Sequence, residues 1–120
     1  MKQKIAIIGG GASGMMAAIT AAKHGADIVL YEHMRLGKKI LATGNGKCNL
    51  SNLHMTKDCF YSHDMKKVEK CLNRFGTSET IAFFDELGLC IKDRNGYLYP
   101  LSEQAAVVQQ MLQAFVERVG

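Results

Sequence analysis

The sequence has no tryptophan, a single proline and no pair of cysteines at C-x-x-C spacing. Its four cysteines, Cys48, Cys59, Cys71 and Cys90, are widely separated, and no histidine stands at zinc-finger spacing from them. Structural metal sites need closely spaced ligands, so we expect none here. The cysteines are expected to be free thiols, which fits a reducing compartment.

Long apolar runs are also absent. The opening apolar stretch, Ile5–Ile8, leads directly into three glycines, so we expect neither a signal peptide nor a membrane span. Together with the free thiols, this predicts a cytoplasmic protein without membrane contact. The remaining composition, 48% hydrophobic over 120 residues, predicts one globular domain with a core of its own.

Acidic residues are scarce in the first half of the chain. Residues 1–57 hold eight lysines and arginines against two acids, whereas residues 58–120 hold seven against nine. Five of those eight cations lie within residues 33–57, where there is no acid. The imbalance predicts that an anionic partner binds the first half.

The first 32 residues have the pattern of a right-handed βαβ unit. Lys4–Ile8 and Asp27–Glu32 are short apolar runs typical of parallel strands buried on both faces. Between them, Ala12–His24 is alanine-rich and ends at Gly25, as a helix with a glycine cap would. The pattern predicts an α/β fold with a Rossmann-like βαβ unit.

The rest of the chain predicts a loop, helices and a hairpin. Residues 34–55 read as a long loop that holds one helical turn at most, and long loops in compact domains are usually functional. Asn95-Gly96 supplies the positive φ angles of a tight turn, and Ser102 is predicted to cap the last helix. The expected elements are helices over Asp64–Phe75 and Thr77–Leu87, strands over Leu89–Lys92 and Tyr97–Tyr99, and a final helix ending at Val119.

Gly9, Gly11 and Gly14 form G-x-G-x-x-G where the first strand meets the helix. In this motif the first glycine makes the tight turn, the second admits a pyrophosphate, and the third lets helix and strand pack closely. The helix that begins at Ala12 directs its free N–H groups at that phosphate, and Glu32 is placed to bind an adenosine ribose. An acid there favours FAD or NAD over NADP; an empty βαβ turn is the alternative.

The loop after Glu32 differs from that of a simple NAD dehydrogenase, in which a helix would soon follow. Its lysines and glycines suit phosphate oxygens, and its asparagines suit the edge of a flavin ring. A solvated basic loop is the alternative reading. Gly37–Leu41 reads Gly-Lys-Lys-Ile-Leu, and Gly44–Asn52 reads Gly-Asn-Gly-Lys-Cys-Asn-Leu-Ser-Asn. With Tyr99–Ser102 (Tyr-Pro-Leu-Ser), these segments resemble flavoproteins of the BaiN/RdsA type, which are NAD(P)- and FAD-dependent oxidoreductases with two dinucleotide-binding domains.

The resemblance implies how FAD would lie on the chain. The pyrophosphate would meet the glycine turn and Ser13, and the adenosine ribose would meet Glu32. Lys38 and Lys39 would border the ribose and phosphates. The ribityl chain and the flavin ring would meet the loop residues Thr43, Gly44, Asn45, Gly46, Lys47, Cys48 and Asn49.

The same resemblance implies a larger protein. Residues 1–120 would be the N-terminal part of an FAD-binding domain: the βαβ unit (3–32), a cofactor loop (33–55), helices and a hairpin (60–101) and a final helix (102–119). Because members of the family are several-fold longer, we expect a truncated chain that is inactive alone. Its parallel sheet would be incomplete, and its unpaired strand edges would favour self-association.

The implied reaction is reduction of the flavin by NAD(P)H and transfer of hydride to an unsaturated small molecule or to uridine in RNA. Cys48 lacks a second thiol five positions earlier, which argues against a dithiol mechanism and favours a packing role. No catalytic acid, base or nucleophile can be identified. An NAD-binding dehydrogenase domain and a non-enzymatic dinucleotide-binding fragment are the alternatives.

Overall fold

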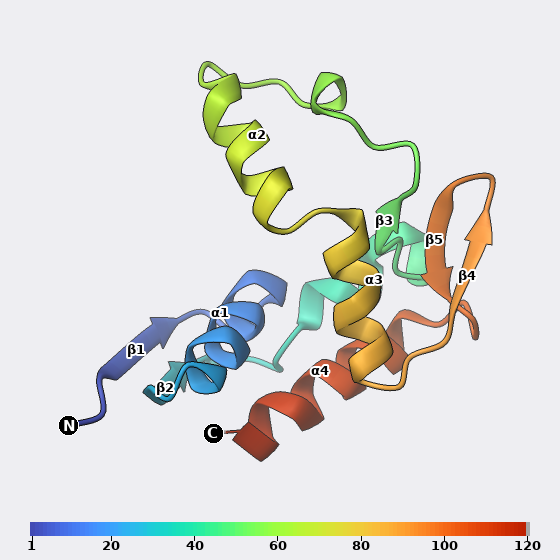
Figure 1. Ribbon diagram of the computed structural model, residues 1–120. Helices are drawn as coiled ribbons and strands as arrows, with labels where there is room; N and C mark the ends of the chain where they lie inside the picture. Colours follow the sequence, from blue (N-terminus) through green and yellow to red (C-terminus); the bar gives the residue numbers. More distant parts are fainter. Residues whose placement is uncertain (120) are drawn as a thin grey trace. The chain divides into compact units, whose positions relative to one another are not determined.

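The computed structural model describes residues 1–119, and the chain divides into two compact units (Figure 1). Unit 1 joins Met1–Cys48 to the segment from Ser102 onward, and unit 2 consists of Asn49–Leu101. Length and composition predicted a single globular domain, whereas the middle of the chain forms a compact unit of its own. It does so because it carries a separate sheet and two helices whose contacts are mainly with one another.

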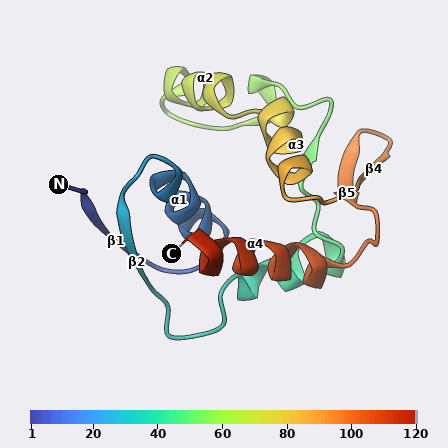
Figure 2. The same ribbon diagram turned by 60° about the horizontal axis from the view of Figure 1, so that its bottom comes forward.

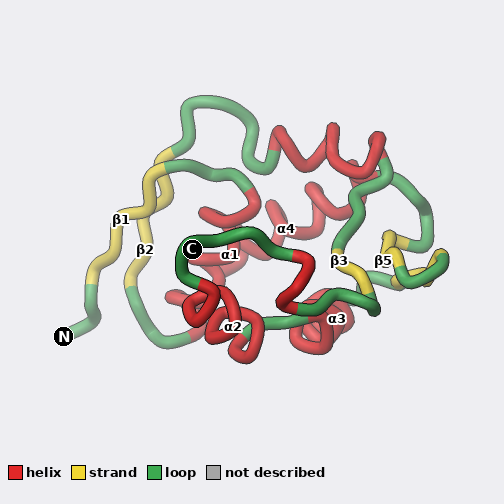
Figure 3. Tube along the Cα trace, turned by 90° about the horizontal axis from the view of Figure 1, so that it is seen from above, coloured by secondary structure: helices red, strands yellow, loops and turns green. Residues whose placement is uncertain are grey.

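Unit 1 contains the predicted βαβ unit. Strand β1 (Lys4–Ile8) leads into helix α1 (Ala12–Lys23), and strand β2 (Asp27–Tyr31) follows. The strands lie side by side (Figure 3) and pair in parallel, from Lys4 opposite Asp27 to Ile8 opposite Tyr31. Gly25, just past α1, has φ +86°, as expected of a glycine that ends a helix. The α/β class and the Rossmann-like unit are therefore confirmed.

The prediction that both strands are buried on both faces is wrong. Along each strand, half-buried side chains alternate with exposed ones. Helix α1 covers the face that carries Ile7, Ile28 and Leu30. On the other face the side chains of Ile8 and Val29 are 81% and 51% exposed. The apolar runs had suggested two covered faces, but the described part of unit 1 supplies helices to only one of them.

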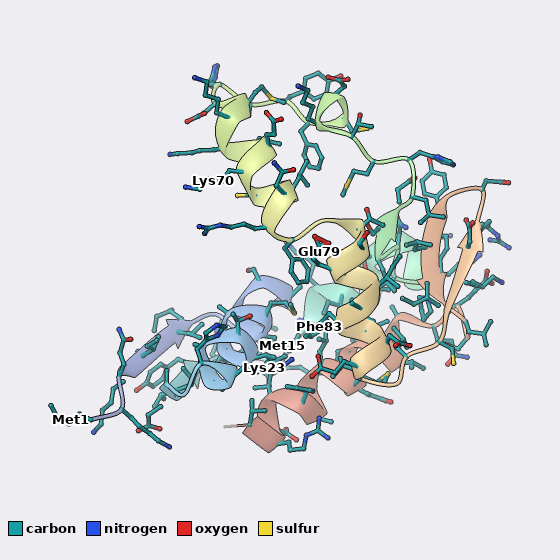
Figure 4. All side chains as sticks on the ribbon, viewed as in Figure 1. Met1, Met15, Lys23, Lys70, Glu79 and Phe83 are labelled. Carbon is teal, nitrogen blue, oxygen red and sulfur yellow. The ribbon has the colours of Figure 1, made fainter. Side chains whose placement is uncertain are left out.

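Helix α4 (Ala105–Val119) lies beside α1 in unit 1 (Figure 2). Its buried side chains include Ala105, Val108, Leu112 and Phe115, which recur at steps of three and four residues. Lys23 lies in the last turn of α1 (Figure 4), and its Nζ atom is 5.4 Å from the centroid of the Phe115 ring. Ser102 does not cap α4, which begins three residues later; its Oγ instead accepts a hydrogen bond from the N–H of Gln104 at 3.3 Å.

The elements of unit 2 are β3 (Ser51–Asn52), the short 3₁₀ turn η2 (Lys57–Cys59), α2 (Met65–Arg74), α3 (Thr77–Glu86), β4 (Ile91–Arg94) and β5 (Tyr97–Pro100). The strands form an antiparallel sheet in the order β3-β5-β4. The hairpin turns where predicted, with φ +53° at Asn95 and +90° at Gly96, although its first strand begins and ends two residues later than expected. β3 was missed because two residues are too few for a periodic pattern. Asp64 caps α2 by accepting from the N–H of Lys67 at 3.2 Å.

Membrane-spanning segments were searched for over residues 1–119. None of the helices within that range has both the length and the apolar character needed to cross a bilayer.

The exposed face of the sheet can be tested by substitutions on it, compared with a substitution at a buried residue of α1. We expect Ile8→Thr and Val29→Thr each to change the free energy of unfolding by less than about 0.5 kcal/mol, since both side chains already meet water. Ile19→Ala, at a side chain 1% exposed, should lower it by about 2–5 kcal/mol. Urea unfolding followed by circular dichroism measures both. A large loss from Ile8→Thr would mean that something covers this face in solution.

Candidate functional site

The glycine turn has the backbone geometry that its motif requires. Gly9 has φ +100°, and its N–H donates to the carbonyl of Tyr31 at 2.8 Å, so the turn is held against the end of β2. A Cβ atom on Gly14 would overlap the carbonyl oxygen of Gly9. Only a glycine at position 14 therefore lets α1 approach the turn this closely.

Gly11 is different, because nothing in the chain itself requires a glycine there. It precedes α1 with φ −76° and ψ −170°, angles that any residue can adopt, and a Cβ built on it meets no atom within 4 Å. No acidic residue lies in the first turn of α1, and no side chain caps the helix. The start of α1 at Ala12 and Ser13 is thus open, and helix geometry leaves its first N–H groups and its positive dipole end available to an anion.

Glu32 lies directly after β2 and is held against the glycine turn. Its Oε2 accepts a hydrogen bond from the N–H of Gly10 at 2.6 Å. This bond is the main reason that the pKa of the Glu32 carboxyl falls below its ordinary value; the Met34 N–H and the charge of His33 add to the effect, and desolvation opposes it. The side chain is therefore an anion at neutral pH, with further lone pairs that can accept hydrogen bonds from ribose hydroxyls.

Gly10 also contributes to the site, although the motif does not predict it. Besides donating to Glu32, it accepts a 2.7 Å hydrogen bond at its carbonyl from the N–H of Gly37. A Cβ atom on Gly10 would overlap the Leu36 side chain and lie 3.0 Å from the Cβ of Glu32. Gly10 occupies one of the variable positions of G-x-G-x-x-G, so the motif assigns it no role. The run of three glycines, Gly9 to Gly11, is the sequence feature that could have pointed to it.

The basic loop is more ordered than predicted. Residues Lys38–Gly46 form the 3₁₀ segment η1, where at most one helical turn was expected. The segment is two short helical pieces joined by a kink, because Thr43 is extended and Gly44 and Asn45 both have φ +56°. Lys38 and Lys39 are exposed at its start. The consecutive left-handed residues explain why Gly and Asn stand here.

The side chains of Cys48 and Asn49 both make contacts within the protein. The Cys48 side chain is 7% exposed, and burial raises the pKa of its thiol, although a hydrogen bond with Thr43 acts against this shift. Such a thiol stays protonated at neutral pH, in agreement with a packing role. The Nδ2 of Asn49 donates to the carbonyls of Ser51 at 2.9 Å and Leu98 at 3.1 Å, within unit 2.

The predicted contacts thus fall into two groups. Unit 1 brings together the glycine turn, the start of α1 and Glu32, with η1 and Lys47 in the same unit. Asn49 belongs to unit 2, and its role toward a cofactor stays a prediction. Within residues 1–119, no cluster of three or more histidine, cysteine or acidic side chains could hold a metal ion.

A pocket of about 360 Å³ lies beside Glu32 in unit 1. Its walls come from α1, β2, the following loop and α4, and they are mainly apolar. The lining residues are Ala18, Ala22, Ile28, Leu30, Glu32, Met34, Leu36, Val116, Glu117 and Val119.

Comparison with known proteins agrees with this geometry. Residues 3–120 match the family model described as HI0933-like protein Rossmann domain. The chain belongs to this family. The resemblance drawn from Gly37–Leu41 and Gly44–Asn52 is thereby confirmed, and the chain is a Rossmann domain of an oxidoreductase family.

Two relatives are considerably longer than this chain. It is 48% identical over 118 residues to the 3-dehydro-bile acid delta(4,6)-reductase of Clostridium scindens, a match that covers 96% of this chain and 29% of the relative. It is 30% identical over 116 residues to a ribosomal RNA dihydrouridine synthase of Haemophilus influenzae, covering 95% and 29%. The chain therefore spans less than a third of the length of these curated relatives.

The contrast between Gly11 and Gly14 predicts opposite effects of the same substitution. Gly14→Ala should lower the free energy of unfolding by about 1–3 kcal/mol, because the new methyl group overlaps the Gly9 carbonyl. Gly11→Ala, which enters open space, should change it by less than about 0.5 kcal/mol. Urea titrations of both variants measure this difference, and equal losses would contradict the geometry of the turn.

Thiol labelling tests the state of Cys48. We expect Cys48 to react with iodoacetamide far more slowly than the exposed Cys59, Cys71 and Cys90, because a buried thiol with a raised pKa forms little thiolate. Mass spectrometry of peptides after brief labelling at pH 7.5 measures this order, with unfolded protein as the control. Labelling of Cys48 as fast as Cys90 would refute the packing role.

Proposed function

We propose that this chain supplies the FAD-binding portion of an NAD(P)H-dependent oxidoreductase that reduces an unsaturated substrate. The observation that carries the proposal is the hydrogen bond from Gly10 to Glu32, which holds an anionic carboxylate against the glycine turn that precedes α1. A pyrophosphate over Gly11 and an adenosine ribose at Glu32 are the two halves of an adenine dinucleotide.

The residues present fit FAD on two counts. The open space at Gly11 would admit a pyrophosphate, since no atom of the chain lies where a side chain would stand. The lowered pKa of Glu32 keeps a carboxylate at the ribose position, and a carboxylate there disfavours the 2′-phosphate of NADP. The loop cations Lys38, Lys39 and Lys47 then supply positive charge for an anionic cofactor.

FAD in such an enzyme supplies hydride transfer, and the protein binds and orients it. In our proposal, Gly9, Gly11, Ala12, Ser13 and Gly14 receive the pyrophosphate at backbone N–H groups, and Glu32 accepts hydrogen bonds from the ribose. Lys38 and Lys39 neutralise phosphate charge. The segment Thr43–Cys48, with Asn49, meets the ribityl and flavin end.

The substrate class rests on the relatives. Their names describe the reduction of a bile acid and the synthesis of dihydrouridine in ribosomal RNA. We propose that the substrate is likewise a molecule with a conjugated or ring double bond. The higher identity to the bile acid reductase favours a small molecule over RNA.

Binding of flavin to the purified chain tests the cofactor. We expect FAD, and not NAD⁺ or NADP⁺, to bind with a dissociation constant measurable by flavin fluorescence quenching. Gly11→Val should abolish binding because its side chain fills the space for the pyrophosphate. Glu32→Gln should weaken binding about tenfold, the loss expected for a hydrogen bond to a charged group.

Glu69→Gln, which removes an exposed carboxylate from α2 in unit 2, is the matched control and should leave FAD binding unchanged. Unchanged affinity in Gly11→Val would refute the site. Binding of NAD⁺ in place of FAD would replace the proposal with an NAD-binding dehydrogenase domain.

A further inference from the structure

Gln109 is the one fully buried polar side chain among the described residues, with 0% of its surface exposed. It lies in the middle of α4, on the same buried stripe as Val108 and Leu112. A buried amide is costly unless its donors and acceptor are all paired. The hydrogen-bond partners of the Gln109 side chain therefore indicate its role.

The amide of Gln109 holds the start of the basic loop. Its Nε2 donates to the carbonyl of Leu36 at 2.7 Å. The N–H of the same peptide group, which belongs to Gly37, donates to the carbonyl of Gly10 at 2.7 Å. One peptide group is thus fixed on both sides, by α4 on one and by the glycine turn on the other.

The rest of the amide is also paired, which fixes its orientation. The Oε1 of Gln109 accepts from Nη2 of Arg35 at 3.1 Å, and Nε2 also donates to Oε1 of Gln113 at 2.7 Å. Leu36 offers only an acceptor and Arg35 only donors, so a flipped amide would lose both bonds. Methionine or leucine at position 109 would fill similar space without either bond.

These bonds continue to the site through Gly10. Gly10 receives Gly37 at its carbonyl and holds Glu32 with its N–H at 2.6 Å. The loop at Gly37 also passes close to α1 and α4. A Cβ atom on Gly37, which has φ +66°, would lie 2.8 Å from Cε of Met15 in α1 and 3.2 Å from Cγ of Gln109 in α4. Movement of this segment therefore moves the turn that holds the ribose acceptor.

We propose that Gln109 is a positioning residue for the dinucleotide site. It fixes the Leu36–Gly37 peptide against Gly10, and so keeps Glu32 and the start of α1 in the arrangement that binds the adenosine and pyrophosphate. This role rests on the proposed function. Gln109 itself touches neither Glu32 nor the open space at Gly11; it acts through the loop.

The experiment compares Gln109→Met with Gln110→Met in the same 120-residue chain. Both variants replace a glutamine of α4 by methionine, but Gln110 is exposed to solvent, whereas Gln109 is buried and donates to the loop. We expect Gln109→Met to weaken FAD binding about tenfold, the equivalent of one net hydrogen bond, and Gln110→Met to leave it within about twofold.

A second readout needs no ligand. In hydrogen exchange followed by NMR, Gln109→Met should speed exchange of the Gly37 amide about tenfold or more in the free chain, whereas amides of β4 and β5 in unit 2 keep their rates. Gln110→Met should not change the exchange rate of the Gly37 amide. A purely structural role would instead speed exchange throughout unit 1 and leave the affinity of the remaining folded protein unchanged.

If Gln109→Met does not fold, the wild-type chain still decides the matter. Its Gln109 side-chain amide protons should exchange slowly and shift when FAD is added; rapid exchange or no shift would overturn the proposal, as would equal effects of the two methionine variants. Failure of the wild-type chain to bind FAD would overturn both the proposed function and the positioning role. In that case, faster exchange of the Gly37 amide in Gln109→Met would still show that Gln109 holds the Leu36–Gly37 peptide.

Discussion

The candidate site depends on the two hydrogen bonds of one glycine. The N–H of Gly10 holds the Glu32 carboxylate, and its carbonyl receives Gly37 at the start of the basic loop. The turn, the Glu32 carboxylate and the loop are therefore connected at a single residue. A larger residue would force apart Leu36 and Glu32, so the site requires glycine here for lack of space, whereas it requires one at Gly9 for its positive φ.

The parts of the fold that were predicted correctly are those set by neighbouring residues. β1 was predicted with its observed bounds because a β-branched run ends at glycines, and the hairpin because Asn95-Gly96 adopts positive φ without tertiary help. The errors arose where distant residues decide. The exposure of Ile8 and Val29 depends on which helices reach the sheet, and the role of Gly10 depends on Leu36, 26 positions along the chain. Periodicity carries no information about either.

The local structure of the basic loop was not predicted in detail. Composition indicated an anion at a basic loop, and the structure adds that the loop is a kinked 3₁₀ segment whose start is bonded to the glycine turn. Cys48 was interpreted as a packing residue, and its burial agrees. The side-chain amide of Asn49 donates to the carbonyl of Leu98 in β5, and no spacing in the sequence reveals this bond, because it depends on the pairing of β3 with β5.

The pairing of β3 with β5 also bears on the order in which the protein folds. The bond between Gly10 and Glu32 spans 22 residues and can form within the βαβ unit alone, whereas the bond between Gln109 and Leu36 spans 73. Contacts of such long range carry a loop-closure cost and form slowly. By joining Ser51 to Leu98, the β3–β5 pair brings the two ends of the inserted unit together and shortens the effective loop that α4 has to close. Pairing within unit 2 therefore shortens the chain closure that the contact between Leu36 and Gln109 in unit 1 requires.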